Sequence, residues 1–307
     1  MKFMENTKIN FMKFKSFGFG LSSVLAFCSI ILLLLGVNLG IDFKGGTAIG
    51  VGFAEEVSIQ EVRSSLKSVS VNENLIDLSG EEIKYFGSQS DVMIKIKSLD
   101  NEPENFGQII INHLHASMSE KVPASKNDFI LSLGSVSPKV GSELSGKAFW
   151  SVISALVLIL FYISVRFEFR FALGAILALV HDVVITLGIF SLTGFEITLS
   201  TVAAFLTIVG YSLNDTIVIL DRIRENMKSS GTVMFESTIN KSINQSLSRT
   251  LITSLTTLFV IIVLLVYGGE VIRPFSFTML VGVIVGTYSS IYIASALLAT
   301  IYQSSNK

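Results

Sequence analysis

The sequence predicts a membrane protein with six transmembrane helices and a small α+β domain of the ferredoxin-like type inserted after the first helix. Half of its 307 residues are hydrophobic and only 15% are charged. The mean hydropathy of +0.64 exceeds the usual range of soluble globular chains. The apolar residues also gather in long segments, except within residues 38–147, where the composition is mixed.

The first apolar segment, Phe17–Val37, is long enough to cross a hydrocarbon core of about 30 Å. Lysines precede it, as in a signal peptide, but the apolar run is too long for one and no small-residue cleavage pattern follows. We therefore predict an uncleaved first span, in which the single cysteine, Cys28, packs as a small hydrophobic residue. Five more spans are predicted at Ala148–Val165, Phe171–Leu192, Ile197–Leu220, Thr250–Tyr267 and Phe275–Tyr302.

Residues 38–147 have the composition of a small soluble domain. Residues 1–37, which include the first span, precede this domain, and residues 148–307 form a bundle of five helices after it. The order strand, helix, strand, strand, helix, strand is the split βαβ pattern of a ferredoxin-like sandwich, in which two helices cover one sheet face. The predicted strands are Thr47–Phe53, Ile83–Gly87, Val92–Lys97 and Phe129–Val136, and the predicted helices are Ser58–Val69 and Glu102–Met118.

Basic residues near the ends of the spans predict the orientation, because short loops rich in Lys and Arg stay in the cytoplasm. Six spans place both termini on one side, and the opposite short loops, 193–196 and 268–274, hold only Arg273. We therefore predict cytoplasmic termini, an inner-membrane location and a periplasmic position for residues 38–147. The basic residues on the predicted cytoplasmic side are Lys2, Lys8, Lys13, Lys15, Arg166, Arg170, Arg222, Arg224, Lys228, Lys241 and Lys307.

Asp215, which follows Asn214 in the fourth span, is a candidate ion-coupling residue because a carboxylate inside hydrocarbon is costly. Asp215 lies 18 residues from Ile197, and Arg249 lies 18 residues from Tyr267. Both are therefore about 27 Å from the outer ends of their helices. Adjacent helices could pair the two charges and make each sensitive to the protonation or hydration of the other. Alternatively, Arg249 extends to the cytoplasmic interface and Asp215 is a buried polar spacer.

His181 and Asp182 form a second candidate pair, about 17 Å inside the third span when counted from Arg170. Because imidazole titrates near neutral pH, the pair could pass protons along or gate a polar cavity. The alternative is a structural hydrogen bond between helices.

Other features narrow the possible function classes. A net charge of −1 gives no long-range field that would attract nucleic acid. His113 and His115 are two residues apart on a predicted helix and so point to different faces, a poor geometry for a metal. With no phosphate-binding glycine loop and no nucleophile elbow in the sequence, we expect no enzyme activity, cofactor or metal. Gly282 and Gly286 in the sixth span are spaced for close helix packing.

Several motifs resemble the SecF branch of the SecD/SecF family, which lies within the RND superfamily of transporters. They cover nearly the whole membrane portion in the family's order, and their combination is specific. The motifs are Gly40-Ile-Asp42-Phe-Lys-Gly45-Gly46-Thr47 after the first span, Ala178-Leu-Val-His181-Asp182 in the third span, Gly210 to Glu225 in the fourth span, and Ser248-Arg249-Thr250.

The resemblance implies half of an RND-type fold, which the partner subunit SecD completes. It further implies an auxiliary role at the SecYEG translocon, where a proton gradient, or a sodium gradient in some relatives, drives motions of the periplasmic domain that help a translocating preprotein to emerge. Asp215 and Arg249 would lie in the ion path, and Asp42, Gly45 and Gly46 belong to the motif after the first span. Membrane lipids are the remaining expected contacts.

Two other functions remain open. The first is an RND-type exporter of small solutes or lipids that acts without SecD, although the other outward loops are too short for the second outer domain of a self-contained exporter. The second is a membrane scaffold that carries no ion flux, which would keep working if Asp215 were replaced by Asn.

The predicted orientation is testable by cysteine labelling. A cysteine at Asn101 should react with a membrane-impermeant thiol reagent added from the periplasm, because the loop charges keep the termini inside. Cys28, within the first span, should stay unreactive. Labelling of position 101 only in inverted vesicles would reverse the assignment.

Overall fold

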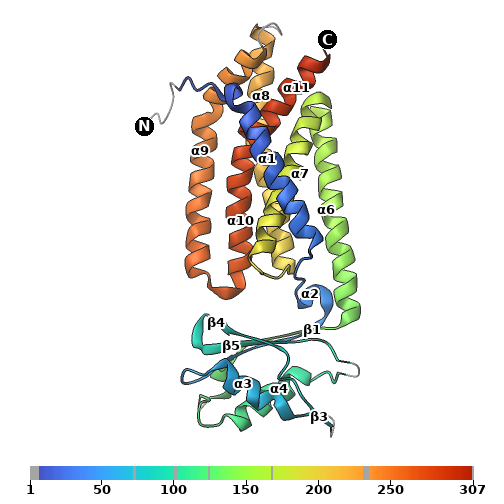
Figure 1. The fold of residues 1–307 in the computed structure, drawn as a ribbon, viewed down its shortest axis with the longest axis vertical. Coiled ribbons are helices and arrows are strands. Elements are labelled where there is room, and N and C mark those ends of the chain that lie inside the picture. Colours follow the sequence, from blue (N-terminus) through green and yellow to red (C-terminus); the bar gives the residue numbers. More distant parts are fainter. Residues whose placement is uncertain are drawn as a thin grey trace. The chain divides into compact units, whose positions relative to one another are not determined.

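The computed structural model describes residues 7–71, 74–99, 102–123, 125–166, 169–230 and 235–305 (Figure 1). It divides into two compact units. Leu39–Phe149 forms an α+β domain, and the residues up to Asn38 together with those from Trp150 onward form a helical bundle. The long helix α6 (Pro138–Arg166) contributes residues to both units. Lys2, Asn101 and Lys307 lie outside the described residues.

The α+β domain contains an antiparallel sheet with the strand order β4-β5-β1-β6. The central strand β1 pairs with β5 from Thr47↔Ile96 to Gly52↔Asp91, and with β6 on its other edge. This order and connectivity are those of the split βαβ sandwich, so the predicted fold class is confirmed. The elements are β1 (Gly46–Gly52), α3 (Ile59–Ser65), β4 (Glu82–Phe86), β5 (Ser88–Ile96), α4 (Phe106–Ser117) and β6 (Ile130–Val136), with short helices α2 (Ile41–Lys44) and α5 (Lys126–Phe129).

The core of this domain lies between the sheet and the two helices α3 and α4, which cover the same face (Figure 1). Alternate residues of β5 face this core, as the period of two of a strand requires. A capping box fixes the start of α3, because Ser58 and Glu61 exchange side-chain-to-backbone hydrogen bonds. The hydrogen bond from Lys121 to Glu61 holds the pKa of that carboxyl below its usual value. The buried apolar residues include Ile49, Val51, Val62, Leu66, Val92, Ile94, Ile96, Ile110, Ile111 and Leu114.

Two predicted helix boundaries were wrong. The helix expected over Ser58–Val69 ends at Ser65, and after the 3₁₀ turn η2 (Leu66–Ser68) the chain enters a two-stranded ribbon of β2 (Val69–Val71) and β3 (Asn74–Ile76). The alternating burial of Val69 and Val71 in this ribbon outweighs the helical pattern. The helix expected from Glu102 begins at Phe106, since the Glu102 carboxylate instead accepts hydrogen bonds from Thr47, Ser98 and Leu99.

The described residues of the bundle include six helices that are long and apolar enough to cross a membrane, which confirms the predicted number. Several of them are longer than the apolar segments of the sequence. For example, α9 begins at Phe235, well before the apolar segment that starts at Thr250. The spans are α1 (Lys15–Leu34) with the preceding turn η1 (Phe11–Phe14), α6, α7 (Phe169–Leu192), α8 (Leu199–Ser230), α9 (Phe235–Tyr267), and α10 (Gly269–Ser289), which a π-helical turn, η3 (Ser290–Ala294), joins to α11 (Ser295–Ser305).

Glycines permit backbone-close packing among the helices of the bundle. A Cβ atom at Gly282 would lie 2.3 Å from Cδ1 of Ile208, and one at Gly286 would lie 2.9 Å from Cβ of Ser212. The same holds between α7 and α1, where a Cβ at Gly188 would lie 2.2 Å from Cβ of Ser29. Such contacts need small residues because helices in lipid associate through close packing rather than through the hydrophobic effect.

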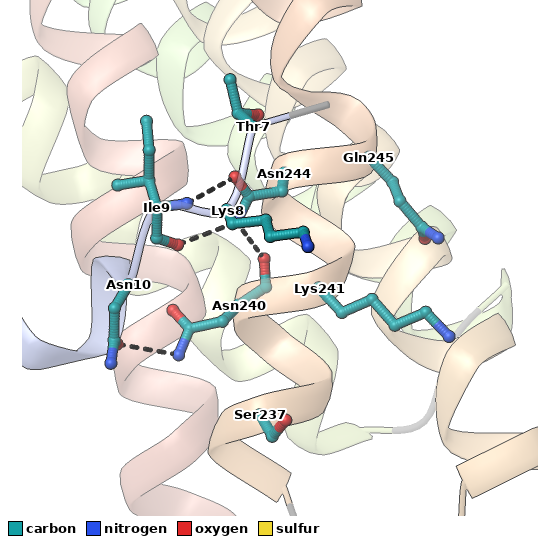
Figure 2. Close-up of a pocket in the computed structure, with 9 residues that line it drawn as sticks. All are labelled: Thr7, Lys8, Ile9, Asn10, Ser237, Asn240, Lys241, Asn244 and Gln245. Atoms are coloured by element: carbon teal, nitrogen blue, oxygen red, sulfur yellow. Dashed lines mark hydrogen bonds between the residues drawn. The ribbon is translucent and has the colours of Figure 1, made fainter. Parts of the chain in front are cut away.

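The segment before α1 is fastened to the polar end of α9 by asparagine side chains (Figure 2). Asn244 accepts a hydrogen bond from the Ile9 amide at 3.0 Å and donates one to the Ile9 carbonyl at 2.8 Å. Asn240 accepts from the Met12 amide at 3.0 Å and donates to the Asn10 side chain at 3.0 Å. These contacts line an open cavity of about 380 Å³. The start of α1 is thus fixed to α9, and the described chain ends lie at the same end of the bundle (Figure 1).

The α+β domain is expected to fold by itself, because its core is continuous and lies within one chain segment. In the excised segment Leu39–Phe149, Ile94→Ala should lower the free energy of unfolding by about 2–5 kcal/mol, since it leaves a cavity at a fully buried site. Urea unfolding followed by circular dichroism measures this.

The matched control is Leu131→Ala, which truncates an exposed side chain of β6 and should change the free energy of unfolding by less than about 0.5 kcal/mol. A disordered excised segment, or equal effects of the two substitutions, would contradict an independent core.

Candidate functional site

Asp182 on α7 lies in the centre of the bundle with none of its surface exposed. One carboxylate oxygen accepts hydrogen bonds from Ser212 on α8 at 2.5 Å and from Ser289 on α10 at 2.7 Å. The other oxygen lies 2.9 Å from Nδ1 of His181. These partners replace the water that a carboxylate loses on burial. Asp182 therefore joins three helices. Nε2 of His181 is buried and has no hydrogen-bond partner among the residues that the structure describes.

Asp215 on α8 is the second buried carboxylate, with 2% of its surface exposed. Its Oδ2 accepts a hydrogen bond of 3.2 Å from Ser254 on α9. The Ser254 hydroxyl is also 2.7 Å from that of Thr287 on α10. Asp215 is therefore held by neutral hydroxyl groups that connect α8, α9 and α10.

Arg249 lies on α9, next to α8, but its side chain is exposed. Within the described part of the chain it forms no ion pair with Asp215 at 4.0 Å or less, although it is near enough to attract the carboxylate electrostatically. The two residues that the sequence placed at equal depth are thus neighbours without a direct contact. The depth argument could not reveal this, because it gives no information about the direction of a side chain.

Asn214 does not share the environment of Asp215, and its side chain is exposed. Successive residues of a helix point about 100° apart, so Asn214 and Asp215 face different surroundings. Asn214, also a candidate ion-coupling residue, therefore lies on a different face of α8 from Asp215. The exposed face of α8 consists of Ala203, Thr207, Gly210 and Asn214.

The hydroxyl residues around the two carboxylates were missed in the sequence. Their signal is weak because Ser and Thr in helices commonly satisfy themselves by bonding to a carbonyl one turn earlier. The π-helical turn η3 is a further unpredicted feature beside them. Ser290 at its start lies 2.8 Å from Thr216, hydroxyl to hydroxyl, and Ser295 donates to the Ser290 carbonyl at 3.0 Å. Such turns occur frequently at functional sites.

The motif after the first span belongs to the α+β domain, whereas the ion-coupling candidates belong to the bundle. Asp42 lies in the short helix α2, and Gly45 and Gly46 follow with φ angles of 78° and 135°. A Cβ at Gly46 would lie 2.4 Å from the Ile96 carbonyl oxygen, so both backbone angle and space require glycine there. Gly45 and Gly46 thus allow the chain to turn from α2 into β1.

The predicted helix residues His113 and His115 have separate structural contacts. Nε2 of His113 lies 2.8 Å from the Ser65 carbonyl oxygen, and the ring of His115 packs edge-on against Phe129. Throughout the described ranges, no group of three or more His, Cys, Asp or Glu side chains is arranged to hold a metal.

Comparison with known proteins places these features in a family. Residues 117–304 match the family model of the protein export membrane protein SecD/SecF, C-terminal, and residues 30–57 match the SecD/SecF GG motif. Protein translocase subunit SecF of Calditerrivibrio nitroreducens is 44% identical over 298 residues, which cover 95% of this chain and 94% of the relative. Its counterpart in Rhodobacter capsulatus is 40% identical and covers 99% of this chain and 92% of the relative.

Solved structures agree. The crystal structure of SecDF from Thermus thermophilus, described as a translocon-associated membrane protein, has a TM-score of 0.83 at 36% identity and covers 99% of this chain. SecDF in a super-membrane-facing form gives a TM-score of 0.70 and covers 98%. This chain spans 40% of the length of each SecDF chain. On the family matches and the relatives at 40–44% identity, the chain belongs to the SecD/SecF family of protein export membrane proteins, among its SecF translocase subunits.

Proposed function

We propose that this protein is an auxiliary subunit of the bacterial Sec translocase that works with SecD and uses the proton or sodium gradient to promote export of preproteins across the inner membrane. A role in protein translocation follows from the family; gradient use and the SecD partnership are the proposed part. The observation that carries the proposal is Asp215, a carboxylate buried in the bundle whose hydrogen-bond donor is a neutral hydroxyl and whose nearby cation, Arg249, is not in contact.

This arrangement can act as a switch because the charge on Asp215 is not locked in a direct ion pair. As a carboxylate, Asp215 accepts the hydrogen bond from Ser254 and attracts Arg249. As a neutral acid it loses that attraction and gains a proton to donate. Since Ser254 also contacts Thr287, the change alters the bonds among α8, α9 and α10. A proton that binds Asp215 more tightly in one of two helix arrangements shifts the equilibrium toward that arrangement.

His181 and Asp182 belong to the same polar interior. Asp182 contacts Ser212 on α8 and Ser289 on α10, two helices that also carry Asp215 and Thr287. A movement of α8 against α10 that follows a change at Asp215 would therefore strain the bonds of Asp182. We assign Asp182 and His181 to the response of the bundle to the ion, in addition to holding the three helices together.

The exposed face of α8 supports the SecD partnership. Asn214 lies at membrane depth on a surface that no other part of the described chain covers, with Gly210 one turn away. An amide facing lipid is unfavourable, and small residues such as Gly and Ala permit a close helix contact. The chain also covers 40% of each SecDF chain, which leaves a second portion in that protein to act as the partner half.

The orientation that the basic residues predict places both termini in the cytoplasm and the α+β domain in the periplasm. In that orientation the domain is the part available to an emerging preprotein, and the bundle is the part available to SecYEG. Exposed side chains such as Phe161 on α6 and Phe259 on α9 suit contact with lipid.

Both alternative functions predict different behaviour. An RND-type exporter of small solutes or lipids would act without SecD, and an ion-independent scaffold would not need a titratable group at position 215. The buried Asp215 argues against the scaffold, because a scaffold would be more stable with an apolar residue in its place. The exporter differs from the proposal in its independence of SecD.

Asp215→Asn should abolish the gradient-dependent stimulation of preprotein export and leave membrane insertion and SecD binding intact. The amide keeps the shape and accepts the bond from Ser254 but does not ionise. Arg249→Lys should keep part of the activity, since it preserves the charge without the planar guanidinium. Export into inverted vesicles with and without an imposed gradient measures both.

Asp221→Asn is the matched control on the same helix. Its half-exposed carboxylate lies 3.9 Å from Arg166 and 3.8 Å from Arg224, contacts worth at most about 1 kcal/mol, so export should be near that of the unmodified protein. If Asp215→Asn responds to the gradient as Asp221→Asn does, Asp215 is not in the ion path.

Gly210→Leu should disrupt co-purification of SecD without affecting the folding of this chain. Among the described residues, nothing beyond the adjacent backbone of α8 lies within 4 Å of a Cβ at position 210, so the larger side chain projects from the surface proposed for the partner. Gly20→Leu on α1 is the control, because its Cβ is equally unobstructed. Equal recovery of SecD with both variants would place the partner on another face.

A further inference from the structure

A second polar site in the bundle is the open cavity of about 380 Å³ beside the start of α1. The segment before α1 forms one wall of this cavity, and the polar first turns of α9 form the other (Figure 2). The volume falls within the range of about 300–1,000 Å³ that is typical of sites for small ligands. The chemistry of the lining groups therefore indicates which ligand the cavity suits.

The side-chain oxygens of the asparagines in this cavity are engaged inside the protein. Oδ1 of Asn244 accepts a hydrogen bond from the Ile9 amide at 3.0 Å. Oδ1 of Asn240 accepts one from the Met12 amide at 3.0 Å, and Oδ1 of Asn10 accepts one from the Asn240 side chain at 3.0 Å. These acceptors are thus committed to the contact between the segment and α9.

Gln245 also has its side-chain oxygen engaged, in this case by α8. Its Oε1 accepts a hydrogen bond from Arg222 and another from Asn226, each at 2.8 Å. The amide nitrogen of a glutamine carries two donors in addition. Within the described residues this nitrogen has no acceptor, so Gln245 offers donors to the cavity that it lines.

Two lysines supply positive charge from opposite walls of the cavity. Lys8 and Lys241 are exposed, and neither forms an ion pair with any described residue. The Ser237 hydroxyl is likewise without a hydrogen-bond partner in that part of the chain, and it can rotate to donate. In Figure 2 the side chains of Lys8, Lys241 and Gln245 extend toward the same side of the view. The cavity therefore has an excess of donors and of positive charge.

Acidic side chains at this end of the bundle pair with other cations. Glu236 on α9 lies 2.5 Å from Nζ of Lys15, and Glu225 on α8 lies 2.5 Å from the guanidinium of Arg222. Neither carboxylate is left to neutralise the two lysines of the cavity, whose like charges repel each other. A bound anion would remove this repulsion.

The cavity extends from the headgroup layer of a membrane into water. Gln245 lies five residues before Thr250, where the apolar segment of α9 begins, and Lys241 lies nine residues before it. At 1.5 Å per residue these separations are about 7 Å and about 13 Å. The headgroup layer is about 5–8 Å thick on each side of the hydrocarbon, and a lysine side chain can extend back toward it. A ligand can therefore enter from the lipid headgroups or from solution.

We propose that this cavity binds a phosphate-bearing anion, which Lys8 and Lys241 hold together with the Ser237 hydroxyl and the Gln245 amide. A phosphate presents several acceptor oxygens to several donors at once, and hydrogen bonds between ions are the strong ones. The phosphate belongs either to the headgroup of an anionic phospholipid or to a small soluble compound. Bound there, it links the segment before α1 to α9. The site goes beyond the proposed function, because it requires neither Asp215 nor a gradient.

Thermal unfolding of the purified full chain in a neutral detergent measures the binding, because a ligand of the folded state raises the unfolding temperature. In one arm, a short-chain phosphatidylglycerol is compared with the matching phosphatidylcholine. In the other, inorganic phosphate is compared with sodium chloride at equal ionic strength. We expect a higher unfolding temperature than the control in at least one arm.

The two arms distinguish the sources of the phosphate. An effect of phosphatidylglycerol alone assigns the site to a lipid headgroup, and an effect of inorganic phosphate shows that a soluble compound suffices. No effect beyond the controls in either arm overturns the proposal.

Substitution of the lysines tests where the anion binds. Lys8→Gln and Lys241→Gln should each weaken binding roughly fivefold, as the loss of an exposed ion pair does, and Lys8→Arg should retain it. The matched control is Lys13→Gln, which removes the same charge from an exposed position in η1 that does not line the cavity. Equal weakening by Lys13→Gln would indicate a general attraction to basic residues and would overturn the site.

Asn244→Ala tests whether both walls of the cavity are needed. It removes both hydrogen bonds to Ile9 and leaves the charge unchanged. Binding should weaken although both lysines remain, because the segment that carries Lys8 is no longer fixed to α9. Unchanged binding would overturn a site shared by the two walls.

Asp215→Asn in the same measurement separates this site from the proposed function. Its binding should equal that of the unmodified protein, because Asp215 does not line the cavity. Failure of the lysine variants to weaken binding would refute the anion site alone, whereas normal gradient-driven export by Asp215→Asn would refute the proposed function alone.

Discussion

Burial of carboxylates inside a membrane bundle is the constraint on which the rest of this structure depends. A carboxylate removed from water needs donors within reach, and hydrocarbon supplies none. Asp182 and Asp215 find them on neighbouring helices, chiefly as serine hydroxyls. Each carboxylate therefore fixes the positions of at least two helices. The residues that satisfy the buried charges are also residues that pack the helices together.

The glycines of α10 make this solution possible. Gly286 lets α10 approach α8 so closely that a Cβ there would meet the side chain of Ser212. Ser289, one turn further along α10, and Ser212 then reach the same oxygen of Asp182. A larger residue at position 286 would separate the two helices and leave the carboxylate with fewer donors. Packing and electrostatics are consequently inseparable at this point of the bundle.

The choice of hydroxyls over a direct ion pair has consequences for coupling. A guanidinium in contact with Asp215 would stabilise the ionised form and hold it there. Hydroxyls stabilise either form, because they donate to a carboxylate and accept from a neutral acid. Arg249 is near but forms no ion pair with Asp215. The charge state of Asp215 can therefore respond to its surroundings, as the proposed gradient-driven switch requires.

The sequence by itself determined the elements whose signals are local or cumulative. Long apolar runs gave the six spans, alternation along residues such as Val92, Ile94 and Ile96 gave the strands, and the cost of a charge in hydrocarbon singled out Asp182 and Asp215. These predictions hold in the folded protein because each depends only on whether a segment faces water, lipid or a protein core. The pattern of apolar and polar residues in a segment indicates which of these it faces.

Only the tertiary structure decided which side chains meet. Equal depth did not bring Arg249 into contact with Asp215, and adjacency in sequence did not give Asn214 the same surroundings, because side-chain direction depends on helix rotation. The serines that hold the carboxylates are brought to them by the packing of α7 to α10. The sequence contains these residues but not their partners, since a hydroxyl that bonds to its own helix and one that serves another helix have the same local pattern.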